Sequence, residues 1–255
     1  TTMLALEAAY QLKQMRKEGN LSGKVDLTTV HRILRLQHFD KSLGYMQHFR
    51  CAGIVSAGRE IDNGISLMEV IKSHISIYLD FIKILRTAGF PIYTPVVRIS
   101  NIRIIEQVAK FVGLNRTELI HNTANPDFKP FEMYNIPLPS LTSTLEVDSE
   151  TLKRINLERS FKFLKMIDTL VLDQLRECYP WVTFEFNLER IAGIGYYSGF
   201  CFHIHSTNEA KREVQLVDGG FTDWIEKLTQ SRKDFCLSSG FGLELFYKLF
   251  PRPTK

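Results

Sequence analysis

Apolar side chains recur at helical spacing over much of the N-terminal part of the chain. This spacing predicts helices over residues 3–18, 66–88 and 148–178. The second of these helices carries apolar residues nearly all round, so we expect it to be buried on most sides. Ser66 and Glu69 have the spacing of a capping box and predict the point where this helix begins.

Shorter apolar runs predict strands between these helices. CAGIVSAG (51–58) is rich in small residues, as is typical of a central strand, and residues 39–49 before it are predicted to be a loop between two strands. Residues 91–100 form another strand candidate. Its prolines indicate either an edge strand or the start of a strand. Ser100 then begins a further helix that ends at Gly113.

In the C-terminal part of the chain, apolar and polar residues alternate, which is the pattern of β-strands. The alternation predicts strands over residues 182–188, 200–205, 213–217 and 235–242, with short helices near 222–230 and 243–250. Helices first and consecutive strands afterwards predict an α+β fold, in which helices flank an antiparallel sheet.

The segment between the two halves is predicted to be a connection. Residues 121–147 hold four of the nine prolines of the chain, and proline interrupts both helices and strands. We therefore expect residues 114–147 to form a Pro-rich connection rather than a packed element. A chain of 255 residues can bury a sizeable core, and residues 1–255 are predicted to form a single core around this connection.

Composition narrows the class of protein. The formal charge of +4 is spread along the chain without a Lys/Arg block, so a tRNA partner is not expected. The four cysteines lie far apart with no CxxC pair, which fits a reducing compartment. No apolar run approaches the roughly 20 residues that cross a bilayer. These features favour a cytoplasmic protein without a membrane partner.

The stretch IAGIGYYSGFCFHIH (191–205) raises the main question about function. Glycines flank Tyr196 and Tyr197, which are predicted to point to opposite faces of a strand. The glycines allow a ligand to approach the backbone closely, whereas paired tyrosines often pack a sheet. The residues alone therefore leave two alternatives open, a binding pocket and a packed core.

The order of the later motifs resembles the C-terminal half of the class II aminoacyl-tRNA synthetase catalytic core. Within that class it is most similar to histidyl-tRNA synthetases and to the regulatory subunits of ATP phosphoribosyltransferase. The family pattern is roughly RGLDYYTG, GGRYD and GLERL; this chain has AGIGYYSG (192–199), GGF (219–221) and GLEL (242–245). More faintly, LALEAA (4–9) resembles LRPEGT, and FDKSLGYMQHF (39–49) resembles FRxERPQxGRYREF.

The resemblance implies a class II synthetase-like antiparallel sheet flanked by helices, with a ligand site on it. We expect the family's first motif to lie before residue 1, its anticodon-binding domain to be missing after residue 250, and the protein to be a homodimer. The residues that the resemblance implies as ligand-binding are Glu7, Gln47, Gly193, Gly195, Tyr196, Tyr197, Ser198, Gly242 and Glu244. For Glu244, a helix-dipole partner is the alternative role.

The family's phosphate-binding arginines are missing. Their positions read Ala5, Asp40, Ala192, Phe221 and Leu245. An enzyme that activates an amino acid with ATP needs such pre-placed charges, and losing one typically costs about 3–4 kcal/mol of transition-state stabilisation. We therefore expect no catalytic residue and no certain cofactor, although ATP is a candidate.

The prediction is a divergent histidyl-tRNA synthetase paralogue, a pseudo-synthetase that acts as a ligand-sensing or regulatory subunit. Its expected partners are a protein, such as an enzyme, and a small amino-acid-like ligand. The alternative is an ATP-dependent, aminoacyl-adenylate-forming ligase with a phosphate clamp rebuilt from Lys41, Arg50 and Arg59.

Other chemistries have less support in the sequence. Cys201 and His205 would lie about 13 Å apart along a strand, too far to share one metal ion with His203, so surface or pocket-rim histidines are predicted instead of a metal site. Ser238 and Ser239 lack the GxSxG spacing of a nucleophile elbow.

Overall fold

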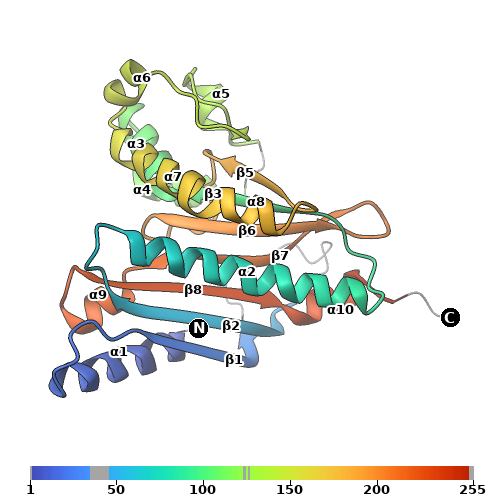
Figure 1. Ribbon diagram of the computed structural model, residues 1–255. Helices are drawn as coiled ribbons and strands as arrows, with labels where there is room; N and C mark the ends of the chain where they lie inside the picture. Colours follow the sequence, from blue (N-terminus) through green and yellow to red (C-terminus); the bar gives the residue numbers. More distant parts are fainter. Residues whose placement is uncertain (1, 35–45, 123–124, 126, 253–255) are drawn as a thin grey trace.

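A computed structural model describes residues 2–34, 46–122, 125 and 127–252. Its centre is one eight-stranded sheet in the order β1-β2-β8-β7-β6-β3-β5-β4 (Figure 1). Every neighbouring pair is antiparallel except β3 and β5. The strands are β1 (Val25–Leu34), β2 (His48–Arg59), β3 (Tyr93–Asn101), β4 (Leu141–Thr142), β5 (Thr183–Asn187), β6 (Phe200–Thr207), β7 (Glu213–Thr222) and β8 (Asp234–Gly242).

Helices flank this sheet, so the predicted α+β architecture is confirmed (Figure 1). They are α1 (Thr2–Lys17), α2 (Ile65–Thr87), α3 (Ile102–Phe111), α4 (Arg116–His121), α5 (Pro130–Met133), α6 (Ser149–Arg154), α7 (Glu158–Ile167), the π-helical turn η3 (Asp168–Leu172), α8 (Asp173–Cys178), α9 (Trp224–Thr229) and α10 (Leu243–Leu249). None of the helices within the described ranges is long and apolar enough to cross a membrane.

The two faces of the sheet are covered differently. On one, the α2 face, α2 lies on the sheet and runs roughly alongside the strands (Figure 1), and its Tyr78 and Phe81 rings pack against Phe241 of β8. On the other, the α1 face, α1 and α9 cover one end of β1, β2 and β8, where Val55 and Cys236 are buried. Paired residues of neighbouring strands share a face, so each strand presents one set of side chains to α2 and the alternate set to the α1 face.

The predicted capping box of α2 is wrong. The residue before the helix is Gly64, with φ of 97°, and the carboxylate of Asp62 accepts hydrogen bonds from the backbone N–H of Ser66 at 3.0 Å and from its hydroxyl at 2.9 Å. Asp62, which does not belong to the predicted pair of Ser66 and Glu69, therefore caps the start of α2. The helix is also less buried than expected, because Ile77 and Ile84 remain exposed on its outer side.

β3 is an interior strand rather than an edge strand. It lies between β6 and β5, and Pro95 falls within a register shift between Tyr93 and Val96 near the strand start. The missing proline N–H is tolerated there because the regular ladder begins after it. The helix that follows is capped by Asn101, whose side chain accepts from the Arg103 N–H at 3.1 Å, and not by Ser100, which belongs to β3.

Residues 114–147 are more than a connection. They contain α4, α5 and the edge strand β4, and their apolar side chains join the main core, namely Leu119, Phe131, Ile136, Leu138 and Leu145. Glu189 anchors the segment by accepting hydrogen bonds from the Phe131 N–H at 2.6 Å and from the Ser140 hydroxyl. Proline spacing alone missed the apolar residues that lie between the prolines.

Two further boundaries differ from the prediction. The helix expected over 148–178 is divided into α6, α7, η3 and α8, with a break at Asn156, whose φ is 58°. Most of the predicted loop at 39–49 lies outside the described residues, and its last residues, His48 and Phe49, already belong to β2.

Candidate functional site

The paired tyrosines lie in a tight turn before β6, not in a strand. Gly193 has φ of 89°, and its carbonyl oxygen accepts hydrogen bonds from the N–H groups of Tyr196 and Tyr197, both at 2.8 Å. The turn brings the two rings together edge to face, with centroids 5.0 Å apart. The expectation that they point to opposite faces of a strand is therefore wrong, because a turn does not have the alternation of a strand.

Tyr197 is a packed core residue. A Cβ atom at Gly193 would lie 2.5 Å from Tyr197 Cδ2, and one at Gly220 would lie 2.6 Å from Tyr197 Cδ1. These glycines therefore make room for the protein's own ring. The Arg190 guanidinium stands 5.3 Å from the ring centroid, and burial, followed by the neighbouring Asp218 carboxylate, raises the pKa of Tyr197 well above its ordinary value.

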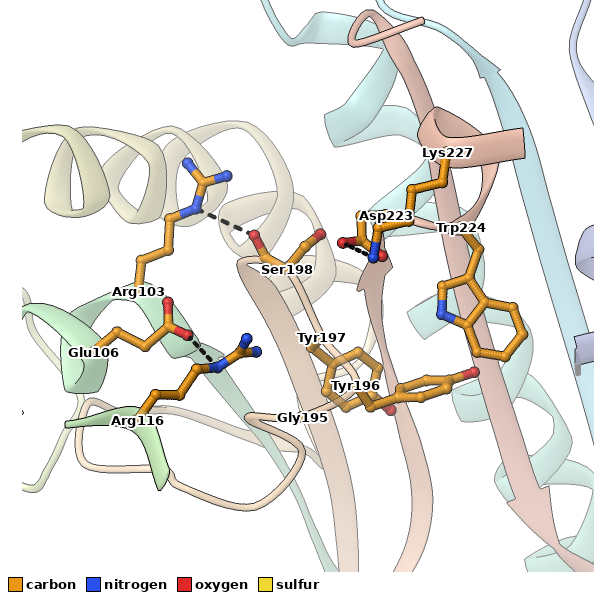
Figure 2. A pocket seen from close by; sticks show the side chains of 10 residues that line it. All are labelled: Arg103, Glu106, Arg116, Gly195, Tyr196, Tyr197, Ser198, Asp223, Trp224 and Lys227. Carbon is orange, nitrogen blue, oxygen red and sulfur yellow. Dashed lines mark hydrogen bonds and ion pairs between the residues drawn. The ribbon is translucent and has the colours of Figure 1, made fainter. Parts of the chain in front are cut away.

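Tyr196 is half-buried, and its ring packs edge to face on Trp224 at 5.6 Å. Its hydroxyl shares a 3.3 Å hydrogen bond with that of Ser238. The two tyrosines together form one wall of an open cavity of about 350 Å³, which we call the α3–α9 cavity (Figure 2). Its lining residues are Arg103, Glu106, Arg116, Gly195, Tyr196, Tyr197, Ser198, Asp223, Trp224 and Lys227.

Four of the predicted ligand-binding residues therefore line the α3–α9 cavity: Gly195, Tyr196, Tyr197 and Ser198. The other lining residues come from α3, the start of α4, and α9 with the residue before it. No motif in the sequence pointed to them. Five are ordinary charged residues and the sixth is Trp224, and only the fold brings them to the turn before β6.

Charged side chains surround the cavity opening. Arg116 donates from Nη2 to the Ile194 carbonyl oxygen at 2.6 Å, and its Nε lies 3.3 Å from a Glu106 carboxylate oxygen. Lys227 and Asp223 form an ion pair of 2.8 Å within α9 and its cap. These contacts hold the side chains around an opening that combines cationic and aromatic groups.

Arg103 completes the charged rim. It donates from Nε to the Ser198 carbonyl oxygen at 3.2 Å and forms no ion pair with any residue in the described part of the chain (Figure 2). Its guanidinium is therefore tied to the turn by one bond and leaves the rest of its donors toward solvent.

Two predicted residues from the N-terminal region do not line this cavity. Glu7 is exposed on α1, where it accepts a hydrogen bond from Gln11 Nε2 at 2.7 Å. Gln47 is exposed just before β2.

The remaining predicted residues also lie elsewhere. Gly193 supports the turn, and Gly242 ends β8 opposite Cys51. Glu244 stands on the first turn of α10 with a carboxylate oxygen 3.7 Å from Arg32 Nη2. Glu244 thus stands at a helix start and has an ion-pair partner there, and its role stays a prediction.

Arg190 is a residue that the sequence interpretation missed. It is only 5% exposed, donating from Nη2 to Asp218 Oδ1 at 2.9 Å and from Nε to the Ala192 carbonyl oxygen at 2.8 Å. It stands two positions before Ala192, where the family resemblance expected an arginine. Its guanidinium, however, forms an ion pair with Asp218 beneath the turn and does not line the α3–α9 cavity.

The prediction of surface or pocket-rim histidines is wrong for His203. It is buried on the α1 face, with Nε2 3.5 Å from Asp218 Oδ1 and its ring 5.4 Å from that of His205. Burial, then the positive charge of Arg190, holds the pKa of His203 well below its ordinary value. His203 is therefore neutral near neutral pH.

Three of the five positions of the missing arginines are filled by packed apolar side chains, whereas Ala192 is exposed. Ala5 is buried in the α1 core, Phe221 packs against the Phe200 and Phe235 rings at 5.8 and 6.2 Å, and Leu245 packs against the main core. Asp40 lies outside the described residues.

The predicted rebuilt clamp cannot combine Arg50 and Arg59. They stand at opposite ends of β2, about 30 Å apart at the rise of a strand and on opposite faces of it. Lys41, the third member of that prediction, lies outside the described residues. A single phosphate therefore cannot contact both arginines.

The remaining candidates of the sequence are a metal site and a nucleophilic serine. Among the residues that the structure describes, no group of three or more His, Cys, Asp or Glu side chains could hold an ion. Ser239 is buried under α2, with its hydroxyl 2.7 Å from His74 Nδ1 and 3.0 Å from the Tyr78 hydroxyl. This serine contacts a histidine, but no substrate can reach it.

Comparison with known proteins places the fold. No protein-family model and no curated protein sequence matches the chain. An ATP phosphoribosyltransferase regulatory subunit/histidyl-tRNA synthetase from Bacillus halodurans matches 97% of this chain with a TM-score of 0.62 at 14% identity. The histidyl-tRNA synthetase from Nostoc sp. PCC 7120 matches 96% with a TM-score of 0.62 at 13% identity.

The fold is that of a class II aminoacyl-tRNA synthetase core. The predicted fold resemblance to histidyl-tRNA synthetases and the regulatory subunit is thereby confirmed. The ATP phosphoribosyltransferase (HisG:HisZ) complex from Thermotoga maritima also matches, over 92% of this chain and 79% of that chain, with a TM-score of 0.50 at 14% identity. The chain spans 62% and 58% of the length of the first two structures.

Proposed function

We propose that this protein is a divergent paralogue of histidyl-tRNA synthetase that forms no aminoacyl adenylate and acts as a ligand-sensing or regulatory subunit. The observation that carries the proposal is the packing at Ala5, Phe221 and Leu245. Apolar side chains occupy positions at which the resemblance expects guanidinium groups. Adenylation needs such fixed charges around the reacting phosphate, and those side chains cannot supply them.

The glycine pair Gly219-Gly220 supports the same conclusion. A Cβ atom at Gly219 would lie 2.5 Å from Phe202 Cε1, and one at Gly220 would lie 2.6 Å from Tyr197 Cδ1. The space over the two glycines is thus filled by the protein's own rings. A ligand phosphate cannot approach the backbone there in the way that glycines elsewhere permit.

Ligand sensing is supported by the α3–α9 cavity. Its volume of about 350 Å³ is within the usual range of small-molecule sites. The turn that bears Tyr196 and Tyr197 links this cavity to the core of the sheet. A ligand bound there would contact this packed wall.

A partner enzyme is the second part of the proposal. One structure with this fold is an ATP phosphoribosyltransferase regulatory subunit/histidyl-tRNA synthetase, and another is an ATP phosphoribosyltransferase (HisG:HisZ) complex. From those proteins we carry over only the kind of role. A homodimer remains a further prediction, which sedimentation of the complete gene product as a monomer would contradict.

ATP–pyrophosphate exchange tests the loss of adenylation. The complete gene product is assayed with each common amino acid, beside an active histidyl-tRNA synthetase as positive control. We expect no exchange above the enzyme-free rate. Exchange with any amino acid would overturn the proposal in favour of a ligase.

The regulatory role needs a separate measurement. The tagged protein is used to purify partners from its source cells, and the catalytic rate of each captured enzyme is measured with and without added protein. A rate that changes in proportion to complex formation supports regulation. Rates that stay constant for every captured enzyme contradict it.

A further inference from the structure

We propose that the α3–α9 cavity binds a small anion, a phosphate or carboxylate group carried on a flat ring. This inference rests on the proposed function, because it identifies the class of ligand for the site proposed there. The anionic group would face Arg103 and Arg116, and the ring would lie toward Tyr196 and Trp224.

The charge of the cavity favours an anion. Arg103, Arg116 and Lys227 contribute three positive charges, and two carboxylates, those of Glu106 and Asp223, line the same opening. Both carboxylates are already engaged, Glu106 with Arg116 and Asp223 with Lys227. The excess positive charge is therefore that of Arg103.

Arg103 has the donors that an anion needs. Its Nε donates to the Ser198 carbonyl oxygen at 3.2 Å, and its two Nη groups meet no acceptor within the described ranges. The fixed planar fork of a guanidinium matches two oxygens of one phosphate or carboxylate. The bond to Ser198 orients that fork, so less rotational freedom is lost on binding.

Arg116 is also held in place at the rim of the cavity. Its bonds to the Ile194 carbonyl oxygen and to Glu106 come from separate elements and hold the side chain over the turn. Glu106 neutralises part of the charge of Arg116. Arg116 therefore contributes mainly an oriented hydrogen-bond donor and little additional net charge. The two arginines lie on one side of the opening in Figure 2.

Aromatic side chains form the other side of the opening. Figure 2 shows Tyr196 and Trp224 across the cavity from the arginines. Trp224 is half-buried, and its ring meets that of Tyr196 at an interplanar angle of 70°. Two rings set at this angle provide both a face and an edge for a flat ligand group. The cationic side of the opening favours an anionic group, and the aromatic side favours a flat ring. Together they favour a ligand in which the anion is attached to a ring.

The two tryptophans of the chain give a direct measurement. Trp224 lines the cavity, whereas Trp181 lies under the Arg86 guanidinium, 4.8 Å from it, and is absent from the cavity lining. The indole N–H signals of the ¹⁵N-labelled protein are followed by NMR, with Trp181→Phe to assign them. The probes are phenyl phosphate, benzoate, inorganic phosphate and uncharged benzyl alcohol.

We expect phenyl phosphate or benzoate to shift the Trp224 signal saturably and to leave Trp181 unmoved, with benzyl alcohol at least tenfold weaker. Tighter binding of phenyl phosphate assigns the phosphate group, and tighter binding of benzoate assigns the carboxylate. The proposal would be overturned if neither phenyl phosphate nor benzoate shifts the Trp224 indole signal, or if both tryptophan signals shift equally. Inorganic phosphate that binds as tightly as phenyl phosphate would overturn the ring contact.

Arg103→Gln is the test of the anion contact. We expect it to raise the Kd at least about tenfold, as for loss of a hydrogen bond to a charged group. Arg103→Lys keeps the positive charge but lacks the planar guanidinium fork, so its Kd should lie between those of the wild type and Arg103→Gln. Lys83→Gln removes one positive charge from the exposed side of α2, away from the cavity lining, and should change the Kd less than twofold.

An unchanged Kd in Arg103→Gln would overturn the assignment. Thermal unfolding of each variant shows that it is folded, and the wild-type titration stands without any variant. Failure of this inference is distinguishable from failure of the proposed function. ATP–pyrophosphate exchange would contradict the proposed function whatever the NMR titration shows. If there is no exchange and the probes do not shift the Trp224 signal, only the proposed class of ligand is contradicted.

Discussion

Two polar networks, each with a histidine, lie on opposite faces of the same sheet and differ in completeness. On the α2 face, His74 Nε2 lies 2.8 Å from the Ser56 hydroxyl and Nδ1 lies 2.7 Å from that of Ser239, which also meets Tyr78. Ser56 in turn donates to Asp26. Every member of this network has a partner, as expected for a network that fixes a helix on a sheet.

The network on the α1 face is less complete. Arg190 Nη1 and His205 Nε2 are both shielded from solvent and have no hydrogen-bond partner among the residues that the structure describes. Arg190 nevertheless holds Asp218 and the Tyr197 ring, and Tyr197 lines the α3–α9 cavity. The two faces therefore differ in that the α2-face network is closed among its own members, whereas the α1-face network surrounds one buried guanidinium that also supports a wall of the cavity.

Removing the buried charge should have the largest effect. Arg190→Met removes the buried guanidinium that bonds to Asp218 and to the Ala192 carbonyl oxygen and stands beside the Tyr197 ring, so we expect a loss of about 3 kcal/mol in the free energy of unfolding. Urea unfolding measures it. Arg159→Met, at an exposed position of α7, is the matched control and should cost less than about 0.5 kcal/mol. Equal losses in both variants would contradict a role for the buried pair.

Gly220→Ala should cost about 2 kcal/mol, as overpacking of a filled core does. Its Cβ atom would lie 2.6 Å from Tyr197 Cδ1 and 2.7 Å from the Phe200 carbonyl oxygen, which cannot move freely. Gly195→Ala on the same turn meets nothing within 4 Å and should be nearly neutral. Denaturant midpoints of the two variants give the comparison, and a neutral Gly220→Ala would mean that the turn is loosely packed.

The α2-face network should make stability depend on pH. Burial lowers the pKa of His74 from 6.5 to about 4, so between these values the unfolded chain binds the proton that the folded protein does not. Stability is therefore present above pH 6.5 and is lost as the pH falls toward 4, by about 2 kcal/mol between pH 7 and pH 5.

Urea unfolding against pH tests this dependence. His203 and His205 have lowered pKa values and act in the same direction, so His74→Asn should reduce the slope without abolishing it. A slope identical to that of the wild type would show that His74 does not titrate on unfolding.

The smallest expected effect comes from one hydroxyl. Tyr78→Phe removes the 3.0 Å hydrogen bond to Ser239 but leaves that serine bonded to His74, so the loss should be about 1 kcal/mol. Thermal or urea unfolding measures it, with Tyr247→Phe at an exposed position of α10 as control. A loss as large as that of Arg190→Met would remove the distinction between the two networks.

Much of the fold could be predicted because its signals are local. The alternation after residue 180 and the helical spacing before it identified most elements, and the GIGYYSG, VDGG and GFGLELF order placed them in a class II synthetase-like sheet. Boundaries failed where a distant or flanking group decides them. Asp62 replaced Ser66 as the cap of α2, and apolar residues between prolines made 114–147 part of the core.

The candidate site was only partly predictable. Gly195, Tyr196, Tyr197 and Ser198 were identified and do line the cavity, whereas Arg103, which completes its charged rim, was not. Nothing in the neighbours of Arg103 along the chain distinguishes it from any other exposed helical arginine. Its position beside the turn arises only because α3 follows β3, which pairs with β6.

By itself, then, the sequence determined most of the elements and their order, the α+β class and the absence of arginines at the positions where the family resemblance expects them. The tertiary structure alone decided that Tyr197 packs against glycines, that Arg190 is neutralised by Asp218, and that three separate helices meet around one opening. The physical reason is range. Periodicity reports on neighbours along the chain, whereas burial, ion pairing and cavities depend on residues that only folding brings together.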